Sequence, residues 1–120
     1  MSNKIVRFTA SLSIAEGKFA EFEKIAQSML AGSREEPGTL VYDWCLSSDR
    51  RQCRLLEAHA SADAVLAHLM GPVVQEYVPR LLGVSSLTSF EVYGDPGPKA
   101  STMLAGFGAT IFSEWCALKE

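Results

Sequence analysis

The sequence lacks the long apolar runs that mark membrane proteins and secreted proteins. No run approaches the roughly 18–20 residues that a membrane-spanning helix needs. The N-terminal stretch MSNKIVRF also lacks the apolar core of about 7–15 residues that a signal peptide contains. We therefore predict a cytoplasmic protein with no membrane as a partner.

Basic residues are not in surplus either. The chain has 11 Lys and Arg against 14 Asp and Glu, a formal net charge of -3, which disfavours a nucleic-acid surface. RNA-recognition modules, whose strand order is the one predicted below, need aromatic side chains on their middle strands. The third predicted strand, residues 52–59, has no aromatic residue. We do not expect nucleic acid as a partner.

Cysteine is scarce, and its spacing is not that of a metal site. The three residues are Cys45, Cys53 and Cys116. A hairpin centred on Asp49 would bring Cys45 and Cys53 face to face, and in a reducing compartment we interpret them as buried thiols. His59 and His68 lie nine residues apart on different predicted elements. On that ground we expect no metal site.

Hydrophobic periodicity predicts an α+β fold. Alternating apolar and polar residues predict strands at residues 5–12, 39–46, 52–59 and 85–93. Apolar residues at intervals of three and four predict helices over residues 16–32, 62–70 and 72–83, the last interrupted by Pro79. This β-α-β-β-α-β order is the ferredoxin-like split βαβ, with a four-stranded antiparallel sheet.

The second and third strands form a predicted hairpin, whose register decides which side chains share a face. A loop centred on Asp49 puts Trp44 opposite Arg54 and Tyr42 opposite Leu56. The other face would then carry Asp43, Leu55 and Glu57.

The chain is short enough to form one domain, which we place at residues 1–94. Residues 95–120 form a C-terminal extension after the stiff linker GDPGP. The apolar residues Phe112 and Trp115 have nothing obvious to pack on inside one copy. We therefore predict that the extension packs on a partner subunit.

The sheet itself also predicts a homodimer. The two helices of a ferredoxin-like sheet cover only one of its faces. The second strand, however, carries apolar residues on both faces. An uncovered apolar face would form a patch that monomers rarely tolerate. Two sheets packed face to face by a two-fold axis would cover it, with Val41 and Cys45 or their opposite-face neighbours in the contact.

The segment from Glu57 to Pro72 combines a strand end with a capped helix. Ser61 is a suitable N-cap and Asp63 lies in the first turn, where a negative charge is favourable. Helical spacing places His68 at the border of the apolar side. We predict a pocket between the sheet and the helix, with His68 reaching into it and Glu57 as its partner. The alternative is a surface Glu and a half-buried His joined by an ordinary hydrogen bond.

Three runs in this chain, EPGTLVYDW, LLEAHASADAVLAHLMGP and FEVYGDP, resemble the antibiotic biosynthesis monooxygenase family over about residues 5–96. Glu57, His68 and Pro72 match its most specific pattern. Relatives commonly have a second His where this chain has Val73, and an aromatic residue where it has His59. The resemblance implies a dimeric α/β barrel, and chemistry without a cofactor or metal. A phenol loses a proton, its anion reduces molecular oxygen, and a peroxide collapses to a quinone.

Under this resemblance His68 moves the proton, and Glu57 orients it or acts as the base. Aromatic side chains would form a wall against a flat ring, and an arginine would hold the oxyanion. The candidates for substrate binding are Tyr42, Trp44, Tyr77, Arg7 and Arg54. The two aromatic residues of the second strand are equally suited to the core, and the arginines to the surface.

Three functions remain open on the sequence. The first is a cofactor-independent monooxygenase that oxidises a small aromatic or quinol-like compound. The second is an isomerase or another proton-transfer enzyme on the same scaffold. The third is a non-catalytic dimer that binds a small ligand, which the loss of the second His at Val73 favours.

Overall fold

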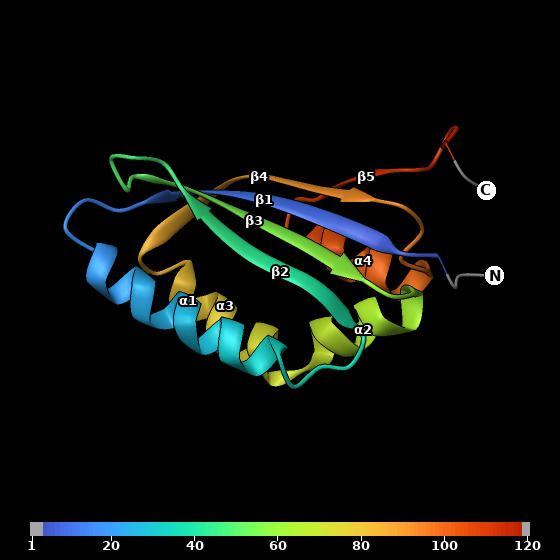
Figure 1. Cartoon of the computed structure of the whole chain (residues 1–120), viewed down its shortest axis with the longest axis horizontal. Coiled ribbons are helices and arrows are strands. Elements are labelled where there is room, and N and C mark those ends of the chain that lie inside the picture. Colours follow the sequence, from blue (N-terminus) through green and yellow to red (C-terminus); the bar gives the residue numbers. More distant parts are fainter. Residues whose placement is uncertain (1–3, 119–120) are drawn as a thin grey trace.

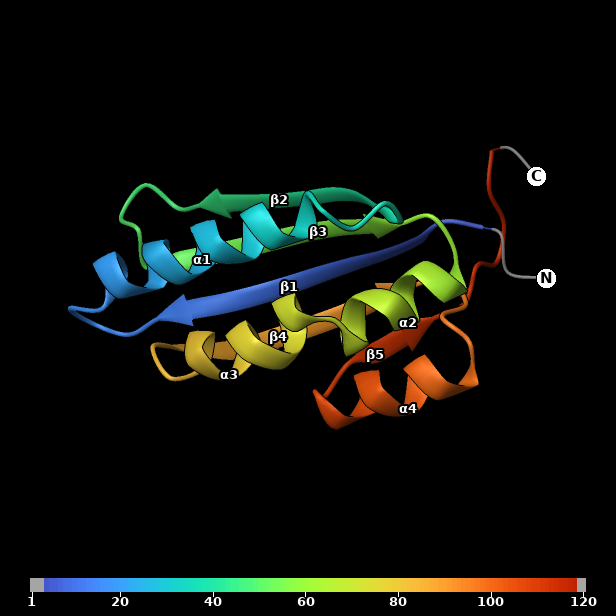
Figure 2. The same cartoon turned by 90° about the horizontal axis from the view of Figure 1, so that it is seen from below.

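The strands of the computed structural model form one sheet, with the helices packed on a single face (Figures 1 and 2). It describes residues 4–118, so residues 1–3 of the predicted domain and 119–120 of the extension lie outside the described residues. In chain order the elements are β1 (Val6–Ile14), α1 (Phe19–Ser33), β2 (Thr39–Leu46), β3 (Gln52–His59), α2 (Ala62–Met70), η1 (Val73–Tyr77), α3 (Val78–Leu81), β4 (Ser85–Tyr93), α4 (Pro98–Gly106) and β5 (Thr110–Phe112). No helix within residues 4–118 is long and apolar enough to cross a membrane.

The sheet confirms the predicted ferredoxin-like α+β fold and extends it by one strand. Its order is β2-β3-β1-β4-β5. The first four strands are antiparallel to their neighbours, as predicted. β5 comes from the extension and pairs in parallel with β4.

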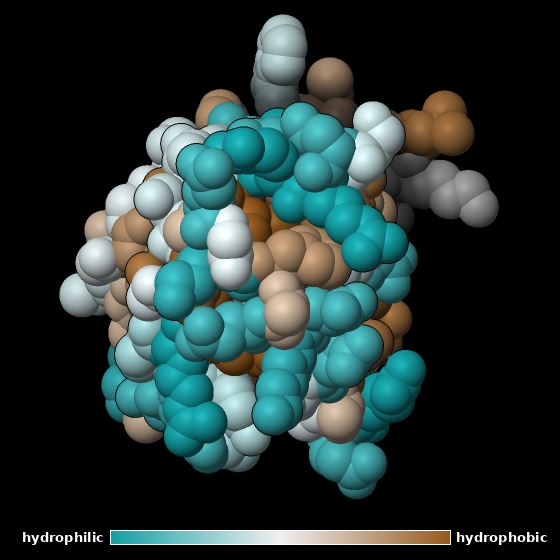
Figure 3. All heavy atoms as spheres, turned by 90° about the vertical axis from the view of Figure 1, so that its left-hand side faces the viewer, coloured by the Kyte–Doolittle hydropathy of each residue, from teal (hydrophilic) through white to brown (hydrophobic). Residues whose placement is uncertain are grey.

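The core lies between the inner face of the sheet and the helices. The central strand β1 alternates strictly, and its inward residues Val6, Phe8 and Leu12 are at most 2% exposed. Figure 3 looks at the end of the molecule where α1 begins, and shows apolar residues within a rim of hydrophilic ones. Strand alternation and helical periodicity thus bury one side of each element, as the pattern predicts.

The segment after α2 is interrupted as predicted. η1 is a π-helical turn, and α3 follows it directly. Pro79 lies in the first turn of α3, where a backbone N–H has no partner within the helix. The interruption redirects the chain over the sheet.

The first part of the extension packs on its own subunit. Ala100 and Leu104 of α4 are 1% and 0% exposed, in a cluster with Val65 of α2. Phe112 of β5 stacks on Tyr93 at 5.4 Å between ring centroids. Contact between a partner subunit and the residues beyond β5 remains a prediction.

The predicted register of the β2–β3 hairpin is wrong by one residue. The backbone N–H of Ser47 donates to the carbonyl of Gln52, so the loop contains four residues. Arg50 has φ of 60°, and the Asp49 carboxylate accepts from the Ser47 hydroxyl and the Arg51 N–H. An even-numbered loop shifts the pairing by one residue.

The shift changes the side chains that face each other. Tyr42 lies opposite Glu57, and Trp44 lies opposite Leu55. Glu57 therefore shares the inner face with Tyr42, contrary to the prediction. The interpretation of the cysteines as buried thiols holds only for Cys53, because Cys45, which pairs with Arg54, and Cys116 are exposed.

Candidate functional site

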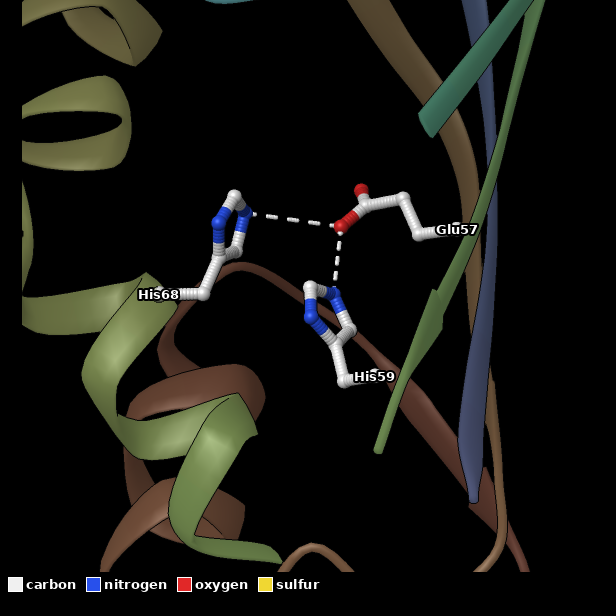
Figure 4. Close-up of side chains that lie close together, drawn as sticks. All are labelled: Glu57, His59 and His68. Atoms are coloured by element: carbon white, nitrogen blue, oxygen red, sulfur yellow. Dashed lines mark hydrogen bonds and ion pairs between the residues drawn. The ribbon is translucent and has the colours of Figure 1, made fainter. Parts of the chain in front are cut away.

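Three side chains meet between the end of β3 and α2. Oε1 of Glu57 lies 2.9 Å from Nε2 of His59 and 3.4 Å from Nε2 of His68. The exposed fractions of Glu57, His59 and His68 are 7%, 0% and 3%. Figure 4 shows the rings approaching the carboxylate from two elements, His59 from β3 and His68 from α2. The predicted proximity of Glu57 and His68 is present, and a second imidazole joins them.

Local sequence explains why these side chains converge. Glu57 and His59 are two residues apart on β3, so both point to the inner face. Ser61 caps α2 as predicted, its hydroxyl accepting from the N–H of Ala64 at 3.2 Å. His68 then falls in the last turn of a short helix that leaves the same strand. The shortness of the β3–α2 connection thus sets the position of His68.

Further polar groups contact both imidazoles at the ring nitrogens that do not face Glu57. Nδ1 of His68 lies 2.7 Å from Oε1 of Glu36. The hydroxyl of Thr39 donates to that same oxygen at 2.8 Å and lies 3.3 Å from Nδ1 of His59. Gly38 between them has no room for a side chain, because a Cβ would lie 2.5 Å from the Cβ of Ala64. The turn is thereby pressed against α2.

The partners of the two ring nitrogens of His68 bear on how the cluster can move a proton. An ionised carboxylate accepts hydrogen bonds and cannot donate them. His68 faces a carboxyl oxygen with each ring nitrogen, Glu57 on one side and Glu36 on the other. Nδ1 of His68 is within hydrogen-bond distance of Glu36, whereas its Nε2 lies at the longer distance of 3.4 Å from Glu57. The imidazole therefore stands between two carboxyl groups, where it can pass a proton from one to the other.

Glu57 and His68 also line a cavity of about 70 Å³ between the sheet and the helices. Its other walls are almost entirely apolar, and Tyr42 supplies the remaining polar side chain. His59, Glu36 and Thr39 are not part of its lining. A bound molecule would meet the cluster through the carboxylate of Glu57 and the ring of His68.

Tyr42 is held in its neutral form. Its ring makes an edge-on contact with His68 at 5.6 Å between centroids. Burial, and next the charge of Glu57, raise the pKa of the Tyr42 phenol well above its usual range. Tyr42 can thus donate a hydrogen bond at neutral pH.

The other predicted substrate-binding residues do not line this cavity. Trp44 is half-buried against Phe22, at 6.0 Å between ring centroids. Tyr77 is half-buried on η1, with the guanidinium of Arg80 5.2 Å from its ring.

The two predicted arginines lie elsewhere. Arg7 and Arg54 are exposed, and each alternates with inward residues of its strand. Their side chains therefore belong to the outer face of the sheet, away from the cavity.

Sequence reasoning missed His59, Glu36 and Thr39 as members of the cluster. The signal for His59 was its two-residue spacing from Glu57 on one strand. Glu36 and Thr39 flank the turn read as EPGT, and only the packing of that turn on α2 brings them to the histidines.

The same three side chains have the composition of a metal site. One ligand atom each from Glu57, His59 and His68 lie within 4.8 Å of one another, a set suited to zinc or ferrous iron. The reasoning that separate elements keep the histidines apart is wrong, because their ring centroids are 4.7 Å apart. Each ligand atom already pairs with another of the trio.

Comparison with known proteins identifies the scaffold. Residues 5–80 match the family described as antibiotic biosynthesis monooxygenase. No curated protein sequence matches the chain.

Several solved structures share the fold. MupZ from Pseudomonas fluorescens is similar at a TM-score of 0.83 and 20% identity, over 98% of this chain and 96% of its own. A putative antibiotic biosynthesis monooxygenase from Caulobacter crescentus has a TM-score of 0.68 and 26% identity, over 75% and 88%. One from Nitrosomonas europaea has a TM-score of 0.69 and 18% identity, over 82% and 96%.

Proposed function

Because the chain belongs to the antibiotic biosynthesis monooxygenase family, we propose that it is a cofactor-independent monooxygenase of a small aromatic or quinol-like compound. The observation that carries the proposal is the position of Glu57 and His68 in the wall of an otherwise apolar cavity. Its apolar walls suit an uncharged ring and molecular oxygen. The buried pair supplies the proton acceptor that oxidation of a phenol requires.

Glu57 is the proposed base. Its Oε1 faces both imidazoles, and no hydrogen bond from residues 4–118 reaches its Oε2. That oxygen accepts the hydroxyl proton of the substrate, while His68 and Tyr42 stabilise the phenolate that forms. A ring carbon then bonds to molecular oxygen, and the peroxide anion that forms takes up a proton from the cluster. The ring hydrogen and this proton leave with one oxygen atom as water when the peroxide collapses to the quinone.

His68 connects this base to the outside. One nitrogen faces Glu57 in the cavity wall, and the other faces Glu36, whose side chain is 20% exposed. A proton accepted by Glu57 can pass through the imidazole to a carboxylate in contact with water. The relay can thus exchange protons between Glu57 and solvent during turnover, including the proton that the peroxide takes up.

The replacement of the second family histidine by Val73 does not remove the chemistry. Val73 is 1% exposed and does not line the cavity. Its neighbour is Gly32, where an added Cβ would lie 2.7 Å from a Val73 methyl group. His59 supplies a second imidazole to Glu57 from another position. These contacts favour an enzyme over a non-catalytic binding protein.

A homodimer formed through the outer sheet face is part of the proposal, as is a cytoplasmic location. Val41, Leu56 and Tyr93 on that face are 37–40% exposed. Covering them by a second copy would remove apolar surface from water. The helices occupy the other face and leave this one open (Figure 1).

The second candidate is an isomerase or other proton-transfer enzyme. The observation that favours it is the relay itself, because a carboxylate and an imidazole in contact can return a proton to a different atom of the substrate. This reaction consumes no oxygen.

Oxygen uptake with a panel of quinols and hydroxylated aromatic compounds tests the proposal. We expect uptake with the wild type, and a loss of roughly 10²-fold or more with Glu57→Gln. Glu76→Gln on the exposed side of η1 is the matched control and should behave as the wild type. Conversion of a substrate without oxygen uptake would favour the second candidate instead.

A further inference from the structure

The polar side chains that line the cavity lie at one end of it. On the sheet, Glu57 lies opposite Phe8 in β1, and Leu12 of β1 lies opposite Leu87 in β4. All four side chains line the cavity. From Glu57 to Leu87 it therefore extends about 13 Å along the strands and about 10 Å across them. A cavity of about 70 Å³ spread over that length fits a slim chain better than a broad fused ring.

The end remote from Glu57 lies between α3 and α4. Leu82, directly after α3, lines the cavity and is 39% exposed. Phe107, directly after α4, lines it from the other side, and its ring is 6.5 Å from that of Phe90. In Figure 2 both helices lie toward the β4–β5 edge of the sheet, with α4 beside β5. β5 pairs with β4 only from Glu91 onward, so it stops short of this part of the edge.

One lip of this opening comes from the C-terminal extension. Leu82 precedes β4, whereas α4 and Phe107 follow it and belong to the extension. Ala100 and Leu104 anchor α4 in the core, which leaves Phe107 half-buried at its end. The extension thus supplies a side chain to the cavity wall as well as a strand to the sheet.

We propose that the substrate is an amphiphile, with a hydroxyl-bearing head at Glu57 and an apolar tail that runs out between Leu82 and Phe107. Phe107 is then a specificity-determining residue supplied by the extension. The inference rests on the proposed function only for the head group. The part of the inference that concerns the tail rests on the apolar lining and on the opening between Leu82 and Phe107.

Binding of para-alkylphenols from methyl to octyl, measured by calorimetry under nitrogen, tests the inference without turnover. For the wild type we expect affinity to rise about fourfold per methylene, and to level off where the tail reaches the opening. Phe107→Ala should level off at a shorter tail, and its affinity should fall more for the octyl compound than for the methyl compound. Phe112→Ala is the matched control, because that aromatic residue of the extension lies against Tyr93 on the outer sheet face. It should reproduce the wild-type series.

Several outcomes would overturn the inference. They are affinity that does not depend on tail length, no binding of any tailed phenol, or the same series for Phe107→Ala and the wild type. Thermal unfolding of each variant shows that it is folded before binding is measured. Because no oxygen is present, the proposed monooxygenase reaction can fail while the tail dependence holds. Equally, turnover of untailed phenols can be found while the tail dependence is absent.

Discussion

Nδ1 of His68 lies 2.7 Å from Oε1 of Glu36, on the opposite side of the ring from Glu57. The imidazole thus bridges a carboxylate that lines the cavity and one that is in contact with water. The role of His68 can therefore be tested separately at its contact with Glu36 and at its contact with Glu57.

Glu36→Gln tests the outer half of the bridge. The amide keeps the shape but removes the charge, so we expect a turnover loss smaller than that of Glu57→Gln. We also expect the wild type to show a downfield Nδ1–H signal of His68 by NMR, and the variant to lose it. Glu35→Gln, at the exposed neighbouring position, is the control. A downfield signal that survives in Glu36→Gln would show that this hydrogen bond does not form.

His68→Ala tests the inner half. Turnover should fall by roughly 10²-fold or more, the usual scale of lost acid–base catalysis. Stability should fall less than in Glu57→Ala, because Glu57 keeps His59 as a partner, whereas removing the carboxylate takes the partner of Nε2 from both buried imidazoles. Chemical denaturation measures the second effect and turnover per folded molecule the first. If activity per folded molecule is unchanged, His68 is a structural residue.

The inner face of the sheet could be predicted because strand alternation depends only on neighbouring residues. The pattern from Val6 to Ile14 has one buried side throughout. The hairpin register could not be predicted in this way. It depends on the four-residue loop closed by Ser47 and Gln52, and a slip of one residue put Glu57 on the wrong face.

The residues of the cluster also divide into those that local sequence predicts and those that it does not. Glu57 and His68 were found because they flank one short connection. Glu36 is 32 residues from His68 in sequence, and no local pattern reports where a turn will pack. Arg7 was predicted to hold the oxyanion only because of its residue type. Its position on the outer face of the sheet follows from the alternation of β1.

Alkaline pH should destabilise the fold through buried acidic groups. Burial raises the pKa of the Cys53 thiol from 9.0 to about 11. Between these values the unfolded chain has lost a proton that the folded chain keeps, so the free energy of unfolding falls as pH rises. Tyr42, whose pKa is also raised, adds to the fall above its usual range.

Cys53→Ala should flatten this decline between about pH 9 and 11, relative to the wild type. Urea denaturation at a series of pH values measures it, and Cys116→Ala at an exposed position is the control. An equally steep decline in Cys53→Ala and the wild type would assign the effect to other groups.

Divalent cations should inhibit the proposed reaction. Zinc bound by Glu57, His59 and His68 would occupy the lone pairs that the relay needs. We expect turnover to be unchanged by exhaustive chelation, and to fall when zinc is added. His59→Asn should weaken zinc inhibition because it removes one ligand. Loss of turnover on chelation, with recovery on adding one metal, would instead make that metal a cofactor.

The outer sheet face and the end of the extension should form the dimer contact. Leu56 is 40% exposed at the centre of that face, between Asp43 of β2 and Thr9 of β1. Trp115 is 95% exposed, although large aromatic side chains are usually buried. Leu56→Lys should weaken dimerisation, because it places a charge in an apolar contact. Removing the residues after Phe112 should weaken it as well, and leaves α4 and β5 in place.

Analytical ultracentrifugation over a range of micromolar concentrations measures both effects. Glu76→Lys, on the helical side of the molecule, controls for the added charge of Leu56→Lys. A wild-type monomer at those concentrations would refute the dimer. A truncated chain with unchanged dimer affinity would confine the contact to the sheet, and Trp115 would then have no part in it.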